Sequence, residues 1–453
     1  MKRLIPIVLL LMLPMSSWAT SGSTMVHITD SAANSTTAGP GISRQGRPVA
    51  VSSDGDVAVM WRPSLATGGI GLDWFTAFST TKDTQFAASN GIFGATRGEV
   101  QSMLYAFYDS IYAVNAATTE AIPFKIVKYV NGVGVRDSSA SSETTTGADK
   151  PGIVHSGTSL LVAHITEDST GATADTMRAY TSSGAWGAHT WTQVATRRPP
   201  ISTGPRLPMN LSGGGVAILF SDANAEDAYI ATSSAISGII EAAMVATDRN
   251  VPGFYRYDAI PFGSVDTFLQ VWQEDTTAAN GAIKARPAHL NGTSSVVFDT
   301  AAEITVVAAG SFGSKYAACP TVTWFPGTDS GMIIWRDLVV TGDTTVIMGK
   351  LISRYGKTYG ADTLLYQMPN TTRKGWGLMA SNTWINGNTK NFVIVMQDSL
   401  AASTDSARAL FVTYDTGDPT PVVVDHSSNT FKNSIAGPQP INRITGPAYV
   451  NKK

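Results

Sequence analysis

The sequence predicts an all-β fold in which one strand-rich unit recurs around a closed ring, and three observations carry this prediction. Strand-like runs end in a bulky apolar residue, a polar residue and usually aspartate at intervals of about 50 to 60 residues. Gly-containing turns separate short β-forming runs, and helical periodicity is nearly absent. We therefore expect a β-propeller with antiparallel blades of three to four strands, seven blades preferred and six possible. The repeated endings are Trp61-Arg62, Phe107-Tyr108-Asp109, Ile165-Thr166-Glu167-Asp168, Phe220-Ser221-Asp222, Trp272-Gln273-Glu274-Asp275, Trp335-Arg336-Asp337 and Met396-Gln397-Asp398.

The first unit is the clearest hairpin. Residues 47–52 lead into the turn Ser53-Asp54-Gly55-Asp56, and Val57 to Trp61 run back. Asp-Gly between β-branched runs favours a tight turn, because Gly accepts a positive φ. The same turn explains the two aspartates without a calcium loop, since the further ligands of such a loop are missing. The second unit, ending at Asp109, has the weakest turn, and six blades remain if it is not a full blade.

The two ends of the chain extend beyond the repeats. Residues 1–19 have a basic start at Lys2 and Arg3, an apolar run too short to span a bilayer, and a small residue at Ala19. This pattern predicts a Sec-type signal peptide and a secreted, periplasmic or cell-surface protein. Residues 20–46 are expected to form an N-terminal strand and linker, with Thr24 to Ile28 added as an outer strand to the last blade. Residues 47–424 would form the propeller and residues 425–453 a wrapping tail.

Composition excludes several classes of partner. The net charge of −2 and only 15% charged residues give no basis for nucleic-acid binding. No second apolar stretch reaches spanning length, so no integral membrane span is expected in the mature chain. The single Cys319 forms no disulfide within the chain. The six histidines have no zinc-like spacing, and neither a metal nor a cofactor is expected.

The aspartates that end the units are interpreted first as turn residues, because Asp readily accepts backbone N–H bonds. The units that depart from the pattern are then the better candidates for binding. These candidates are Arg62, the pair Glu167 and Asp168, and the pair Glu274 and Asp275.

The tryptophans divide in the same way. Trp61, Trp272 and Trp335 share one repeat position and are expected to pack between blades. Trp186 and Trp191, with His189 between them, form the densest cluster outside that position. Flat aromatic rings near a turn can stack on the apolar face of a sugar, so these three residues are candidate binding residues.

The repeats resemble those of secreted bacterial β-propellers and, in general outline, the sialidase-like superfamily. The motif Ser-x-Asp-x-Gly-x-Thr-Trp of that superfamily is absent, and residues 52–56 are only distantly similar. The three arginines and the tyrosine–glutamate pair of sialidases find no match, so sialidase activity is not implied. No nucleophile elbow or phosphate-binding loop occurs either.

The sequence therefore favours a non-catalytic binding protein that recognises a glycan or a protein on a cell or particle surface. Whether the protein is an enzyme stays open. The alternative is a polysaccharide-acting hydrolase or lyase, with acidic residues from several blades around a central pocket. A second alternative is a structural subunit of a virion or extracellular assembly.

Overall fold

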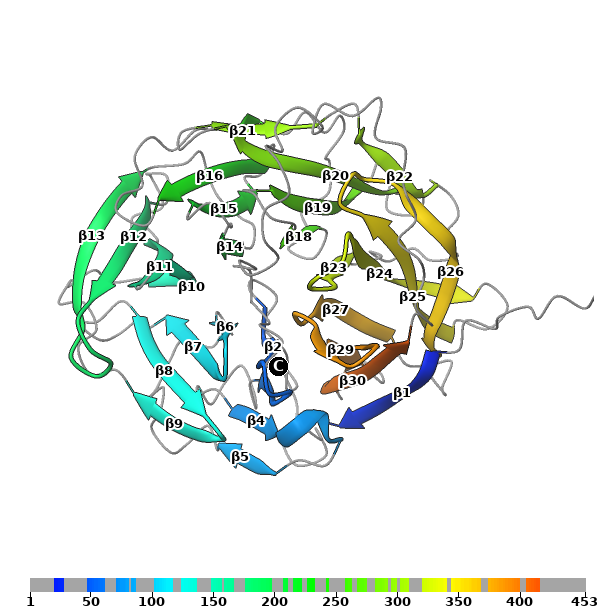
Figure 1. The fold of residues 1–453 in the computed structure, drawn as a ribbon, viewed down its shortest axis with the longest axis horizontal. Helices are drawn as coiled ribbons and strands as arrows, with labels where there is room; N and C mark the ends of the chain where they lie inside the picture. The colour runs from blue at the N-terminus through cyan, green and yellow to red at the C-terminus, as the bar shows by residue number, and fades with distance from the viewer. Residues whose placement is uncertain are drawn as a thin grey trace, which may run out of the picture.

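The computed structural model describes a closed ring of antiparallel sheets (Figure 1). The residues that it describes are 20–27, 47–61, 71–80, 83–86, 102–116, 124–136, 148–156, 159–166, 176–197, 207–210, 215–221, 226–232, 242–243, 257–262, 267–274, 282–291, 295–299, 302–308, 320–339, 344–367, 374–399 and 405–415.

Within these residues the strands form seven sheets, which we call blades 1 to 7 in chain order. The first three blades hold four strands each. Blade 1 contains β2 (Val49–Val51), β3 (Val57–Trp61), β4 (Gly71–Phe75) and β5 (Thr84–Phe86), with the short 3-10 helix η2 (Thr76–Phe78) after β4. Blade 2 contains β6 (Ser102–Phe107), β7 (Ser110–Ala116), β8 (Phe124–Val130) and β9 (Val133–Arg136). Blade 3 contains β10 (Ala148–Ser156), β11 (Ser159–Thr166), β12 (Thr176–Ser183) and β13 (Thr190–Arg197).

The remaining blades continue the same order. Blade 4 contains β14 (Leu207–Asn210), β15 (Gly215–Ser221), β16 (Glu226–Thr232) and β17 (Ala242–Ala243). Blade 5 contains β18 (Tyr257–Phe262), β19 (Thr267–Glu274), β20 (Ala282–Asn291), β21 (Ser295–Phe298) and β22 (Ile304–Val307). Blade 6 contains β23 (Thr321–Trp324), β24 (Ser330–Val339), β25 (Thr344–Ser353) and β26 (Thr358–Gln367). Blade 7 contains β27 (Lys374–Ala380), β28 (Trp384–Asn386), β29 (Thr389–Ser399), β30 (Asp405–Asp415) and β1 (Thr20–His27).

The inner strands of successive blades contact one another around the centre, and β2 also contacts β29, which closes the ring (Figure 1). The all-β propeller expected from the sequence, with seven blades preferred, is therefore confirmed. Strand β1 pairs with β30 on the outer edge of blade 7, with Met25 opposite Leu410. The expected pairing of the N-terminal segment with the last blade is thus observed, and it starts at Thr20, four residues earlier than expected.

The core lies between blades rather than under a single sheet. The buried hydrophobic clusters join blades 1 and 2, blades 2 and 3, blades 5 and 6, and blades 6 and 7. Every residue of β2, β3 and β4 is buried, because both faces of an inner strand pack against a neighbour. This two-sided burial explains why the sequence shows continuous apolar runs in these strands and not a strict alternation.

The repeated tryptophans behave as the sequence predicts. Trp61, Trp272 and Trp335 are at most 8% exposed and belong to the hydrophobic clusters. The second repeated ending is out of register, however. Most copies end the second strand of a blade, whereas Phe107 ends β6, the first strand of blade 2, and Asp109 lies in the turn to β7. The sequence of this tight two-residue turn resembles the end of a repeat unit. The assignment of Phe107-Tyr108-Asp109 as such an end was therefore wrong.

Several expectations fall outside the described residues. The signal peptide of residues 1–19, the linker part (residues 28–46) of the predicted segment 20–46, Cys319 and the tail of residues 425–453 lie there. The domain boundaries and the extracellular location stay predictions. In the part of the chain that is described, no helix has the length and apolar character needed to cross a membrane.

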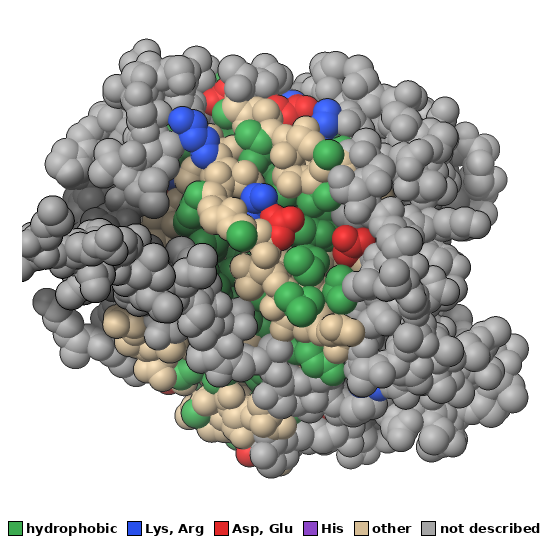
Figure 2. Space-filling model, turned by 90° about the vertical axis from the view of Figure 1, so that its right-hand side faces the viewer, with side chains coloured by type: hydrophobic (Ala, Val, Ile, Leu, Met, Phe, Trp, Pro, Cys, Tyr) green, Lys and Arg blue, Asp and Glu red, His purple; other side chains and the backbone are tan. Residues whose placement is uncertain are grey.

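The side of the ring that carries β26 and β1 is weakly charged. Figure 2 shows its described side chains as mostly hydrophobic or uncharged, with scattered charges of both signs. On strands β25 and β26, Lys350 and Asp362 form an ion pair at 2.7 Å. The described surface on this side accordingly follows the low charge content of the sequence.

Candidate functional site

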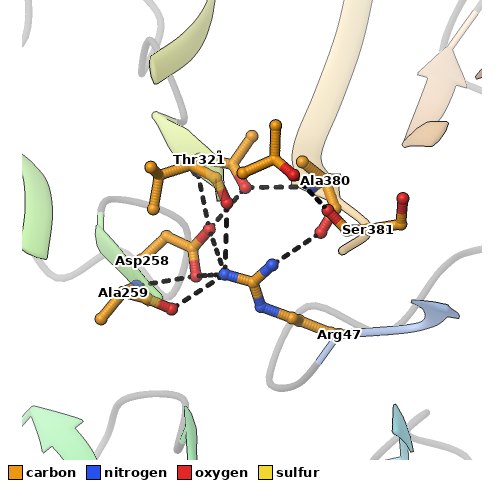
Figure 3. A network of polar contacts seen from close by, with 8 residues as sticks. Arg47, Asp258, Ala259, Thr321, Ala380 and Ser381 are labelled. Atoms are coloured by element: carbon orange, nitrogen blue, oxygen red, sulfur yellow. Dashed lines mark hydrogen bonds and ion pairs between the residues drawn. The ribbon is translucent and has the colours of Figure 1, made fainter. Parts of the chain in front are cut away.

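A buried polar network occupies the centre of the ring (Figure 3). Arg47, just before β2 in blade 1, reaches Asp258 of blade 5 with Nη2 at 2.9 and 3.0 Å from the two carboxylate oxygens. Its Nη1 donates to the carbonyl of Ala380 in blade 7 at 3.0 Å. Asp258 is fully buried and the Arg47 side chain is 11% exposed. The ion pair therefore joins blades that are not neighbours in the ring.

Each carboxylate oxygen of Asp258 is satisfied by further donors. Oδ1 accepts the N–H of Ala259, and Oδ2 accepts the hydroxyl of Thr321 at 2.6 Å and the N–H of Val322 at 2.9 Å. The Thr321 hydroxyl in turn accepts the N–H of Ala380. Because the Asp258 carboxylate accepts hydrogen bonds from all these protein groups, its role is structural. The network consequently ties blades 1, 5, 6 and 7 together, and the sequence had not identified it.

The acidic residues expected around a central pocket stay a prediction, because Glu167, Asp168 and Asp275 lie outside the described residues. The carboxylate of the network in Figure 3, that of Asp258, is neutralised by Arg47 and fully enclosed.

A different pair of carboxylates, those of Asp56 and Asp83, lies in two turns of blade 1. One turn joins the first and second strands, and the other joins the third and fourth strands. Because the strands alternate in direction, these turns share one side of the ring. We call this side the hairpin face; it includes residues 53–56, 76–80, 83, 108–109 and 184–189.

The hairpin of blade 1 is built as its sequence predicts. The Ser52 hydroxyl accepts the N–H groups of Asp54 and Asp56, and Gly55 takes a φ of +88°. A Cβ at Gly55 would lie 3.0 Å from the indole of Trp384, so any larger residue would require this ring to shift. The turn is therefore fixed by both backbone conformation and a close contact.

Two carboxylates of blade 1 bind consecutive amides of η2. Asp56 Oδ1 accepts the N–H of Ala77 at 3.0 Å, and Asp83 Oδ2 accepts the N–H of Thr76 at 2.5 Å. Consecutive residues are about 3.8 Å apart and each hydrogen bond adds about 3 Å, so these two oxygens lie within about 10 Å of each other. Separations of about 5 to 10 Å are those used by paired carboxyls in glycoside hydrolysis.

The environments of the two carboxyls differ. Asp56 is 5% exposed, whereas Asp83 is exposed to solvent. Burial raises the pKa of Asp56 above its usual value of 3.8; the N–H of Ala77 opposes this shift, and the negative charges of Asp54 and Asp83 add to it. A carboxyl that keeps its proton to higher pH can act as an acid beside a second, ionised carboxylate.

The backbone that holds the pair is in an uncommon conformation. Ala77 and Phe78 have φ values of 51° and 58°, in the left-handed region that residues other than glycine seldom adopt. The N–H of Phe78 donates to the carbonyl of Gly55 at 2.7 Å, and its ring lies 6.0 Å from that of Trp384. A strained backbone conformation of this kind persists only where the surrounding contacts hold it in place, and it is frequent at functional sites.

The aromatic cluster expected from the sequence is also present on the hairpin face. His189 lies between Trp186 and Trp191, with ring centroids at 5.5 and 5.8 Å and edge-to-face geometry on both sides. All three side chains are partly buried. The structure therefore brings these three candidates together, with Trp186 and His189 in the turn between β12 and β13 and Trp191 at the start of β13.

The other candidates are not tested. Arg62, Glu167, Asp168 and Asp275 lie outside the described residues, and for Glu274 only its place as the last residue of β19 is described. Conversely, the sequence placed Asp56 in a hairpin turn but gave no sign of its partner Asp83. Asp83 lies 27 positions after Asp56, beyond strands β3 and β4, and spacing alone does not show that the start of β5 lies near the first turn.

No known protein family profile matches the sequence, and no curated protein matches it. Solved structures do resemble the fold. An α-L-arabinofuranosidase of Fusarium graminearum, solved with an iminosugar inhibitor, is 10% identical with a TM-score of 0.44, and the match covers 73% of this chain and 97% of that one. An α-L-arabinanase of Penicillium chrysogenum is 14% identical with a TM-score of 0.42, covering 88% and 99%. The sialidase of Trypanosoma rangeli is 8% identical with a TM-score of 0.41, covering 86% and 59%.

The likeness to these structures is one of fold, and it identifies no specific protein. These structures also correct the functional prediction. The sequence favoured a non-catalytic binding protein, whereas the similar structures named here are carbohydrate-cleaving enzymes, so this prediction is not upheld. The chain is an all-β propeller that resembles these solved structures in its fold.

Proposed function

We propose that this protein is an exported glycoside hydrolase that acts on a polysaccharide, with its reaction centre at Asp56 and Asp83 on the hairpin face. The observation that carries the proposal is the placing of these two carboxyls on consecutive amides of η2, one buried and one exposed.

The proposed roles follow from the two environments. Asp56, whose pKa is raised by burial, donates a proton to the leaving oxygen of the glycosidic bond. Asp83, which is exposed, acts from the other side as nucleophile or as the base that activates water. The partly buried Trp384 and Phe78 supply apolar surface beside the pair.

The test is release of reducing sugar from neutral polysaccharides. The panel should include arabino-oligosaccharides, because arabinobiose is bound in two of the similar structures. Asp56→Asn and Asp83→Asn are each expected to lower the rate by about 10²- to 10⁴-fold, the usual contribution of a general acid or base. Asp362→Asn, at an exposed carboxyl on β26, is the matched control and should retain the full rate.

Two results would refute the proposal. One is a wild-type protein that releases no sugar from any member of the panel. The other is an Asp56→Asn variant as active as Asp362→Asn.

A further inference from the structure

The three aromatic candidates of blade 3 are one end of a longer set of ring contacts. Trp186 meets Tyr112 of blade 2 edge-to-face at 5.6 Å, and Tyr112 lies 6.3 Å from His155. His155 stacks on Phe107 at 3.7 Å with an interplanar angle of 4°. We call this set the aromatic row; it consists of Phe107, His155, Tyr112, Trp186, His189 and Trp191.

The aromatic row leads toward the carboxyl pair of blade 1. Tyr108 packs edge-to-face against Phe107 at 4.4 Å and is 46% exposed. The carbonyl of Tyr108 accepts the N–H of Ser53 at 2.8 Å, in the same hairpin turn that carries Asp56. The row therefore connects the β12–β13 turn with the proposed reaction centre along the hairpin face.

The row is fixed in place but not enclosed. Trp186 and Trp191 pack against the hydrophobic cluster between blades 2 and 3, yet both remain partly exposed, as does His189. Tyr112, beneath them, is buried. Rings held by a core and open to solvent on part of their surface suit a flat apolar partner at a low cost in conformational entropy.

The charges beside the row favour an uncharged ligand. Lys128 lies over the ring of Tyr112 at 5.8 Å, while Asp109 faces the same tyrosine from the β6–β7 turn. Burial, with Asp109 as the second cause, raises the pKa of Tyr112 to about 12, so the phenol stays neutral at ordinary pH. The positive and negative charges offset each other, and neither sign dominates.

We propose that the aromatic row binds a neutral glycan chain and guides it to the carboxyl pair, an inference that rests on the proposed hydrolase function. The ligand class is an uncharged sugar polymer, whose rings present apolar C–H faces to the aromatic side chains and whose hydroxyls remain in water. The direct contacts are assigned to Trp191, His189 and Trp186.

The test is affinity electrophoresis of the full chain in gels that contain dissolved neutral or acidic polysaccharides. Trp191→Ala should weaken retardation by a neutral polymer at least tenfold, while Trp191→Phe, which keeps a ring, should remain within about threefold of wild type. The matched control is Val133→Ala, at a 64% exposed residue at the start of β9, which should bind like wild type. Thermal melting by circular dichroism confirms that each variant is folded.

The outcomes separate this inference from the proposed function. Neutral-polymer binding that depends on Trp191, without any sugar release, supports the row and refutes the hydrolase. Sugar release with equal binding by wild type and Trp191→Ala refutes the row alone. Stronger retention by acidic than by neutral polymers, or no retention of wild type by either, also refutes the row.

Discussion

Arg47 and Asp258 meet at 2.9 Å in the centre of the ring although they belong to blades 1 and 5. The pair is enclosed, and the surrounding donors and acceptors are the Thr321 hydroxyl and main-chain groups of blades 5, 6 and 7 (Figure 3). The ring is therefore held closed by this buried ion pair at its centre as well as by the pairing of β1 with β30 at its outer edge.

Asp258→Asn is expected to lower the free energy of unfolding by about 3–5 kcal/mol, because it leaves the Arg47 guanidinium buried without its counter-charge. The measurement is chemical denaturation followed by tryptophan fluorescence. Asp362→Asn breaks the exposed pair with Lys350 and should cost no more than about 1 kcal/mol. Equal losses in the two variants would contradict a structural role for the central pair.

Asp56→Asn should change the pH dependence of stability. The folded protein holds the Asp56 proton above pH 3.8, where the unfolded chain releases it, because burial raises the folded-state pKa. The contribution of Asp56 to stability is thus complete below pH 3.8 and is lost as pH rises through the raised pKa. Wild type should lose stability relative to the variant over this range in thermal melts at stepped pH; a constant difference would exclude the shift.

Gly55→Ala should destabilise the protein more than Gly327→Ala. Both glycines have positive φ in the first turn of a blade, so each substitution carries a backbone cost of about 1–2 kcal/mol. A Cβ at position 55 also meets the Trp384 indole at 3.0 Å, whereas nothing lies within 4 Å at position 327. Melting temperatures of the two variants measure the difference, and an equal loss would show that Trp384 moves aside freely.

Removal of residues 1–27 should lower the melting temperature and promote aggregation, because it exposes the edge of β30. Removal of residues 1–19 leaves β1 intact and is the matched control. Light scattering during a thermal ramp distinguishes the two proteins. Identical behaviour would mean that β1 contributes little to ring closure.

The parts of the fold that depend on local sequence were predictable. The Asp-Gly turn at residues 54–55 and the buried positions of Trp61, Trp272 and Trp335 follow from short patterns that repeat. A local pattern also misled, since the turn at Tyr108 and Asp109 resembles the end of a unit.

Sites that form across the ring were not predictable from spacing. Arg47 and Asp258 are separated by 211 positions, and their meeting depends on how many blades close the ring. Within blade 1, Asp56 and Asp83 each accept a hydrogen bond from a backbone N–H of η2. This arrangement has no recognisable pattern in a single sequence. The cluster of Trp186, His189 and Trp191 was visible because all three residues lie in or beside one turn.

The pairing of Met25 with Leu410 sets a condition on how the chain reaches its final state. The outermost strand of blade 7 is synthesised long before its partner β30, because all the other blades lie between them in the sequence. Contacts between positions so distant in sequence form slowly, because a long loop has to close before they are gained. The ring is therefore expected to close only after the strands of blade 7 have been synthesised.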